Sequence, residues 1–248
     1  MKRTCGLVFV TLLFFLSPCQ AGVLDKLDWQ MKDFPLSAVG RQVSLDDTTI
    51  VKGLKEALAT GTERAITEVA RPDGYFGNSL IKILLPDKVQ RVAELLGSVG
   101  YQKQVDEFVL SMNRAAEAAA PKAASFFGDA IRDMTVEDAR GILAGGDTAA
   151  TRFFEKKLRS KLFDSFKPVI ADSMGQVGTV RYYKNMMGTY GNLPLASMLG
   201  VPSLDLDSYV TNKALDGLFT MVGQEEKKIR TNPAARTSEI LQTVFGGK

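Results

Sequence analysis

Apolar residues recur at every third or fourth position along most of this chain, the spacing that places side chains on one face of an α-helix. The spacing predicts helices over residues 44–70, 86–97, 102–134, 135–144, 147–174, 182–190, 205–231 and 237–245. Pro121 either kinks the third of these or starts a new helix. Thr135 with Asp138, and Asp147 further on, are predicted to cap helix N-termini.

Two stretches interrupt the helical pattern between residues 70 and 86. Arg71-Pro72-Asp73-Gly74 has the composition of a tight turn. Residues 80–85 (LIKILL) are short, apolar and bounded by Pro86, so they are predicted to be extended, but one strand makes no sheet. The pattern therefore predicts an all-α protein, with a single compact multi-helix domain of about eight or nine helices and no substantial sheet.

The N-terminus has the layout of a secretory signal peptide. A basic pair precedes an apolar run of about twelve residues, which is too short to span a bilayer, and small residues follow it. We expect cleavage after Ala21 and a periplasmic or secreted product, while a lipoprotein anchored through Cys19 is the less favoured alternative, because Pro18 fits that processing poorly. The predicted organisation is a signal peptide (1–21), an amphipathic segment and linker (22–43) and an all-helical domain (44–248).

Composition excludes several kinds of catalysis. The chain has no histidine, and its 2 cysteines both lie in the predicted signal peptide. Ser-His-Asp and Cys-His sites, ordinary zinc sites and haem ligated by histidine or cysteine are therefore ruled out, and we expect no cofactor. The formal net charge of +3 offers no strong field for nucleic acid, and no later stretch is apolar for long enough to cross a membrane.

The stretch MNRAAEAAAPKAASFF (112–127) sets two charged residues among alanines. Arg114 and Glu117 are three positions apart and Asn113 and Glu117 four apart, so all three share one side of a helix. One interpretation is an acid–base glutamate oriented by Asn113. The simpler one is an ion pair that fixes the register of two closely packed helices.

Two other sets of residues are candidates for binding. Asp129 and Asp133 carry carboxylate oxygens at a spacing that suits Mg²⁺ or Ca²⁺, but solvated surface charge is the favoured interpretation of this pair. A group of methionines either lines an adaptable apolar pocket or fills the core. Its members are Met174, Met186, Met187, Met198 and Met221. A basic helix face, at Lys156, Lys157, Arg159 and Lys161, either rests on anionic lipid or faces solvent.

A family resemblance covers about residues 44–245. In order, the segments are GLKEAL, GTERAI, RPDGYF, VDEFVLSMNRAAEAAAPKA, DAIRDMTVEDARGIL, GGDTAATRFF, YVTNKALDGLF and NPAART. Together they resemble domain-of-unknown-function family 4197, a family of exported bacterial proteins. The resemblance implies a helical fold and an envelope location, and it implies no activity and no catalytic residues.

These observations lead to two functional hypotheses. The first is a non-catalytic binding or interaction protein of the bacterial envelope, whose partner is an apolar small molecule or an envelope protein. The alternative is a carboxylate-dependent hydrolase, with Glu117 as acid–base and Asp129 and Asp133 as helpers or ligands of Mg²⁺ or Ca²⁺.

Overall fold

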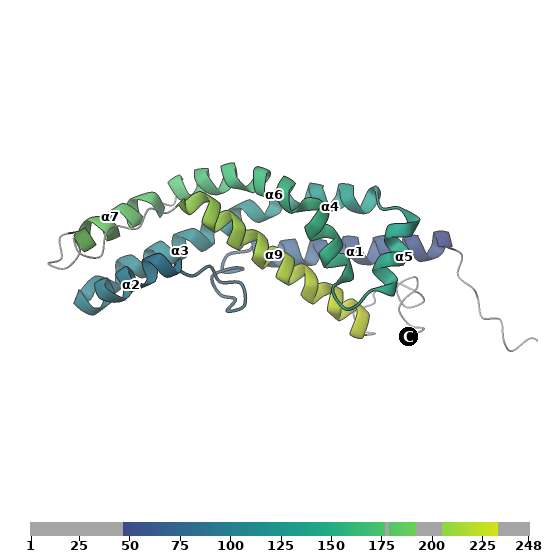
Figure 1. Cartoon of the computed structure of the whole chain (residues 1–248), viewed down its shortest axis with the longest axis horizontal. Coiled ribbons are helices and arrows are strands. Elements are labelled where there is room, and N and C mark those ends of the chain that lie inside the picture. Colours follow the sequence, from purple (N-terminus) through teal and green to yellow (C-terminus); the bar gives the residue numbers. More distant parts are fainter. Residues whose placement is uncertain (1–46, 177–178, 192–204, 233–248) are drawn as a thin grey trace, which may run out of the picture. The chain divides into compact units, whose positions relative to one another are not determined.

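Helices are the regular elements throughout the computed structural model of the protein, which describes residues 47–176, 179–191 and 205–232 (Figure 1). These residues contain no strand, so the all-α prediction is confirmed for them. The predicted signal peptide, the segment 22–43 and the last predicted helix lie outside the described residues. The count of eight or nine helices for the whole chain therefore stays a prediction.

The α-helices of the described residues agree closely with the apolar spacing. They are α1 (Asp47–Ala70), α2 (Asp87–Leu96), α3 (Gln102–Ala119), α4 (Ala123–Arg132), α5 (Val136–Ala144), α6 (Ala149–Gln176), α7 (Thr179–Gly191) and α9 (Leu206–Thr231). A π-helical turn, Gly97–Tyr101, joins α2 to α3, and a 3₁₀ turn, Ala120–Lys122, joins α3 to α4. Pro121 thus ends one helix and a new one follows, the second of the two predicted outcomes.

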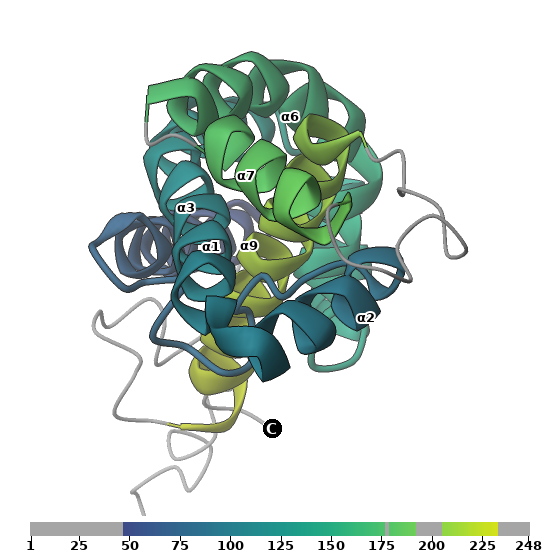
Figure 2. The same ribbon diagram turned by 90° about the vertical axis from the view of Figure 1, so that its left-hand side faces the viewer.

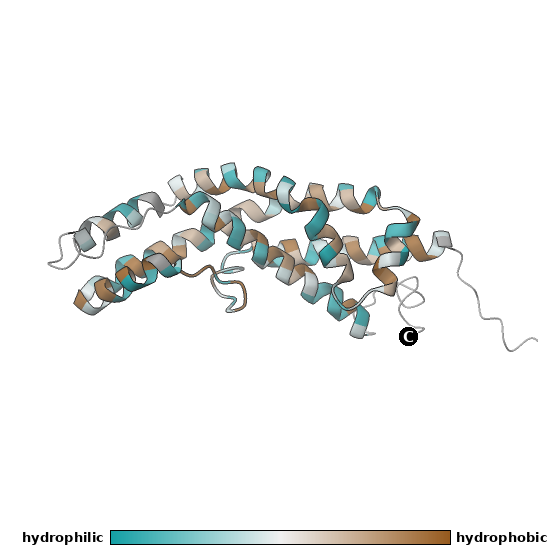
Figure 3. Cartoon of the chain, in the orientation of Figure 1, coloured by the Kyte–Doolittle hydropathy of each residue, from teal (hydrophilic) through white to brown (hydrophobic). Residues whose placement is uncertain are grey.

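Helix α9 is the central element of the core. It packs against α6, α1 and α3 and runs between them in Figure 2. Buried residues occupy nearly every side of α9, whereas α6 buries a single stripe that includes Phe154, Leu162 and Phe166. Apolar and polar positions alternate along the helices (Figure 3), as expected for helices that each bury one face.

Helix ends are fixed by side chains in some of the predicted places. Thr135 and Asp138 form a capping box, in which the Thr135 hydroxyl accepts the Asp138 N–H at 3.1 Å and the carboxylate accepts the Thr135 N–H at 3.0 Å. Asp205 caps α9 by accepting the N–H of Ser208 at 3.0 Å. These bonds hold the pKa of both carboxyl groups below the ordinary range.

Asp147 does not cap α6 as the sequence predicts. The helix begins at Ala149, and its first free N–H groups are bound by Glu226 of α9, described below. A buried carboxylate from another helix therefore replaces the local cap.

Candidate functional site

Residues 71–86, here called the 71–86 loop, connect α1 to α2 and form hydrogen bonds to both α3 and α9. The loop begins with the predicted turn, in which the Gly74 N–H donates to the Arg71 carbonyl at 2.9 Å. Asp73 takes a left-handed backbone conformation, with φ of 63°. Gly74 follows because a Cβ there would lie only 2.5 Å from the Glu68 carbonyl oxygen. Of the predicted extended stretch 80–85, residues 80 and 81 belong to a turn, and residues 82–86 form neither helix nor strand.

Glu117 of α3 holds this turn. Its side chain is buried, and one carboxylate oxygen accepts the main-chain N–H groups of Tyr75 at 3.1 Å and Phe76 at 3.3 Å. The other oxygen pairs with Arg114 at 2.7 Å, and Arg114 reaches Asp73 at 2.7 Å. The Glu117 pairing raises the pKa of Arg114, so this guanidinium stays charged. The predicted pairing of Arg114 with Glu117 thus exists, but it fastens a turn to α3 and does not pin a second helix.

Asn113, one turn before Glu117, holds the extended part of the loop. Its side chain is fully buried. The side-chain oxygen accepts the Ile83 N–H at 2.8 Å, and the amide nitrogen donates to the Ile83 carbonyl at 2.9 Å and to the Val109 carbonyl at 2.8 Å. The three sequence candidates on α3 are therefore brought together, and all three bind main-chain or side-chain groups of the 71–86 loop.

Helix α9 holds the other side of the loop. The hydroxyl of buried Tyr75 donates to the Ala214 carbonyl at 2.6 Å, and burial raises the pKa of this phenol far above its ordinary value. Gly217 makes room for the Tyr75 ring, since an added Cβ would lie 2.6 Å from a ring carbon. Near the start of α9, the Tyr209 hydroxyl donates to the Leu84 carbonyl at 2.9 Å.

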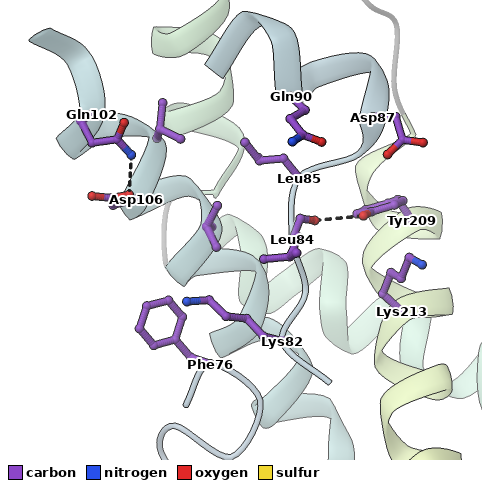
Figure 4. A pocket seen from close by; sticks show the side chains of 12 residues that line it. Phe76, Lys82, Leu84, Leu85, Asp87, Gln90, Gln102, Asp106, Tyr209 and Lys213 are labelled. Carbon is purple, nitrogen blue, oxygen red and sulfur yellow. Dashed lines mark hydrogen bonds between the residues drawn. The ribbon is translucent and has the colours of Figure 1, made fainter. Parts of the chain in front are cut away.

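A groove of about 700 Å³ lies beside the loop, between α2, α3 and α9 (Figure 4). Its apolar lining is Phe76, Leu84, Leu85, Val105, Val109 and Tyr209. Its polar lining is Lys82, Asp87, Gln90, Gln102, Asp106 and Lys213. This volume is within the range of protein sites that bind small molecules or peptide side chains.

The charged groups of the groove are largely unpaired. The Lys82 ammonium lies 3.9 Å from the centre of the Phe76 ring, which is a cation–π contact and not an ion pair. Within the described residues, Lys82, Lys213 and Asp87 make no ion pair. Burial, followed by the charge of Asp87, raises the pKa of Tyr209. A ligand with charges of both signs would therefore find partners here.

The methionine candidates belong to the core wherever their side chains are described. Met174, Met187 and Met221 are buried in the main hydrophobic cluster and do not line the groove. The side chains of Met186 and Met198 lie outside the described residues. For these three methionines the geometry favours the core interpretation over the ligand pocket.

The aspartate candidates lie on the surface of α4 and its end. Asp129 pairs with Arg132 at 2.9 Å, with a side chain 63% exposed, and Asp133 is exposed at the C-terminus of the helix. Among residues 47–176, 179–191 and 205–232, no three acidic side chains come together in a way that could hold a metal ion. Glu117 lies in a different site, bound to the loop.

Glu226 is a second buried carboxylate, which the sequence analysis did not single out. Its oxygens accept the Ala150 N–H at 2.9 Å and both the N–H and the hydroxyl of Thr151 at 2.8 Å. Arg230 binds the same carboxylate at 2.9 Å and donates to the Ile142 carbonyl at 2.8 Å. The sequence feature that could have indicated this ion pair is the spacing of Glu226 and Arg230, which are four positions apart on one helix.

The basic face of α6 is partly neutralised. Arg159 pairs with Glu155 at 2.8 Å and with Asp216 of α9 at 2.5 Å, and Lys157 lies 5.2 Å from the Phe153 ring. In the part of the chain that is described, no helix has the length and apolar character needed to cross a bilayer.

The fold and the groove define an all-helical protein with an open cleft of mixed charge, in which the buried carboxylates serve the fold. Residues 44–246 match the family described as protein of unknown function (DUF4197), and the chain belongs to that family. The family assignment made from the sequence is thus confirmed, while the envelope location that the resemblance implies stays a prediction. No curated protein and no solved structure matches the chain.

Proposed function

We propose that this protein is a non-catalytic binding protein and that the groove beside the 71–86 loop is its binding site. The observation that carries the proposal is the combination of an apolar lining with three charged side chains, those of Lys82, Lys213 and Asp87, that form no ion pair with any described residue. Burying an unpaired charge is costly in a folded core, but charged groups at the rim of a groove orient a ligand. The groove is also held rigidly, because α3 and α9 both bond to the loop that forms one wall.

The state of the buried carboxylates supports a non-catalytic role. An acid–base carboxylate needs a free oxygen facing a substrate. In Glu117 both oxygens are already hydrogen-bonded to the chain itself, and the same is true of Glu226. The hydrolase alternative therefore has no geometric support at Glu117, and a substitution at that residue tests it directly.

We also propose that the protein acts in the bacterial envelope after export. The support is the basic, apolar and small-residue order of the first 21 residues. Mass spectrometry of the protein isolated from cells that make it tests this: a chain beginning at Gly22 is expected. A chain that retains residue 1 would contradict export by this route, and an acylated chain beginning at Cys19 would show a lipoprotein instead.

A filled groove tests the binding function. Val109 is half-buried on α3 and lines the groove, so Val109→Trp should occupy it. Val136→Trp is the matched control, because Val136 is 46% exposed on α5 and does not line the groove. Each protein is isolated from its own cells and then analysed by mass spectrometry, for small molecules in an organic extract and for co-purified polypeptides.

The expected result is a stoichiometric molecule or polypeptide that is bound to the wild type and to Val136→Trp and lost from Val109→Trp. Equal recovery from both variants would remove the groove as the binding site. Recovery of nothing from any of the three proteins would contradict the binding function.

A further inference from the structure

The extended part of the 71–86 loop has the features of a β-strand without a neighbour. Burial alternates from the end of the preceding turn into this segment: Ile81 and Ile83 are buried, whereas Lys82 is partly exposed and Leu84 is 61% exposed. This alternation is the two-residue period of a strand lying with one face on a core. The segment lines the groove through Lys82, Leu84 and Leu85.

Its main-chain groups are used on one side and open on the other. Both polar groups of Ile83 bond to the side chain of Asn113. In an extended chain the N–H and C=O of one residue point the same way and those of the next residue point the opposite way. The polar groups of Leu84 and Lys82 therefore face away from Asn113.

On this second side a donor and an acceptor are unused. The Leu84 carbonyl accepts a bond from Tyr209, a residue of the groove, which shows that this side faces the groove. Within the described residues, the Leu84 N–H and the Lys82 carbonyl have no hydrogen-bond partner. An unpaired strand edge of this kind is a template for another extended chain.

We propose that the groove takes an extended peptide segment of a partner protein, which pairs with the main chain of Lys82 and Leu84 as an added strand. The proposal rests on the proposed binding function and names its ligand class. Strand addition supplies affinity through main-chain hydrogen bonds, and the side chains of the added segment supply specificity. Every second side chain of the peptide would lie on the apolar lining formed by Leu85, Val105 and Val109.

The charges of the groove suit a peptide better than a lipid. In Figure 4, Lys82 and Lys213 lie toward the lower end of the groove and Asp87 lies at the upper right, while Asp106 lies at the left beside Gln102. A fatty acid carries one negative head and would leave the Asp87 carboxylate without a partner, whereas Asp106 already accepts a hydrogen bond from Gln102 at 2.8 Å. A peptide with an acidic side chain near one end and a basic side chain near the other would pair with both the lysines and the aspartate of the groove. Its main chain would also accept the Leu84 N–H, which a hydrocarbon tail would leave unpaired.

Two probe classes test the proposal by NMR on the mature protein. The first is a panel of synthetic peptides of about nine residues that alternate apolar and polar side chains, with glutamate near one end and lysine near the other, in both orders. The second is dodecanoate. We expect at least one peptide to bind saturably. The Leu84 amide proton should then shift downfield, because it gains a hydrogen bond.

Protein variants at Leu84 separate main-chain pairing from side-chain contact. Leu84→Pro removes the N–H at an exposed, extended position where proline is tolerated, and Leu84→Ala removes the side chain but keeps the N–H. We expect the bound peptide to weaken at least tenfold with Leu84→Pro and less than threefold with Leu84→Ala. Peptides methylated at single main-chain nitrogens provide the same test on the wild-type protein, and one position should weaken binding at least tenfold.

The outcomes separate the two proposals. Equal affinity for Leu84→Pro and Leu84→Ala, or no effect of methylation at any position, would overturn strand addition. Saturable binding of dodecanoate at the groove amides without binding of any peptide would also overturn it, while leaving the groove as a binding site. If neither probe class moves the groove amides, both proposals fail.

Discussion

The side-chain amide of Asn113 bonds to both main-chain polar groups of Ile83, accepting the N–H at 2.8 Å and donating to the C=O at 2.9 Å. These are the two bonds that a neighbouring strand would make. A single buried side chain of α3 therefore substitutes for a sheet partner and fixes the extended segment 82–85 in place. The position of one groove wall depends on this pair.

Loss of the Asn113 amide should destabilise the protein. Asn113→Ala leaves the buried N–H and C=O of Ile83 without partners, which should lower the free energy of unfolding by about 2–4 kcal/mol. Asn212→Ala is the matched control, because Asn212 is exposed and bonds only within its own helix. Its effect should be within about 0.5 kcal/mol. Urea unfolding followed by circular dichroism measures both, and equal effects would contradict the role of Asn113.

Glu117 and Arg114 should behave as a structural pair. Glu117→Gln keeps an oxygen for the Tyr75 and Phe76 N–H groups but loses the charge that binds Arg114, at an expected cost of about 1–3 kcal/mol. Arg114→Ala should cost a similar amount, and the double variant should cost less than the two single effects added together. Thermal and urea unfolding of the four proteins measure this coupling.

The same variant tests the hydrolase alternative. A catalytic Glu117 predicts that Glu117→Gln abolishes an activity and leaves the melting temperature nearly unchanged. Glu63→Gln is the control, since Glu63 is an exposed glutamate of α1 that belongs to no candidate site. The structural role would be contradicted if Glu117→Gln were as stable as the wild type. It would also be contradicted if the destabilisation of the double variant equalled the sum for Glu117→Gln and Arg114→Ala.

Helices such as α6 were predictable because they bury a single face, so the spacing of their apolar residues carries the information locally. The capping box of Thr135 and Asp138 could also be predicted, because its two residues are only three positions apart in the sequence. The neighbouring positions of Arg114 and Glu117 also followed from helix geometry.

The partners of those residues were not predictable. Glu117 binds the N–H groups of a turn about forty positions earlier, and the sequence interpretation had placed a second helix there. Similarly, Asp147 was a reasonable local cap for α6, but Glu226, far along the chain, supplies the bonds. Main-chain groups carry no sequence signal, so a side chain that binds them across the fold leaves no pattern to detect.

Glu226 should contribute more to stability than an exposed glutamate. Glu226→Ala removes the bonds to Ala150 and Thr151 and also the ion pair with Arg230, whose side chain is 11% exposed. Breaking such a buried pair should cost about 3–5 kcal/mol. Glu155→Ala should cost less than about 1 kcal/mol, because the Glu155–Arg159 pair is only part-buried and Arg159 keeps its second partner, Asp216.

Hydrogen exchange locates the effect of the Glu226 substitution. The amides of Ala150 and Thr151 should exchange much faster in Glu226→Ala, because their acceptor is gone. Unchanged protection at these two amides would show that the carboxylate is not their partner in solution.

Two glycines in helices should respond oppositely to alanine. In Gly217→Ala the new Cβ would lie 2.6 Å from a Tyr75 ring carbon and 3.1 Å from the Ile81 Cβ, so overpacking should cost about 1–3 kcal/mol. Gly128 lies in α4 with nothing within 4 Å of an added Cβ. Gly128→Ala should therefore stabilise the protein by up to about 1 kcal/mol. Thermal unfolding distinguishes them, and a stabilised Gly217→Ala would contradict the close approach of loop and helix.

Alkaline pH should weaken the attachment of the loop to α9 through Tyr75. Burial, then the charges of Glu117 and Asp216, raises the pKa of Tyr75 above its ordinary value of 10.0. The folded protein therefore keeps the phenol proton at a pH where the unfolded chain releases it. The contribution of Tyr75 is fully present below pH 10 and is lost as the pH rises above the pKa of the unfolded chain, by about 1.4 kcal/mol for each pH unit.

Tyr75→Phe isolates this effect. The variant loses the bond to the Ala214 carbonyl and is less stable than the wild type at pH 8, but it has no proton to release at residue 75. The stability difference between the two proteins should therefore shrink by about 1.4 kcal/mol between pH 8 and pH 11. Tyr183 and Tyr209, whose pKa values are also raised by burial, are present in both proteins and cancel. A constant stability difference between Tyr75→Phe and the wild type over this range would contradict the raised pKa of Tyr75.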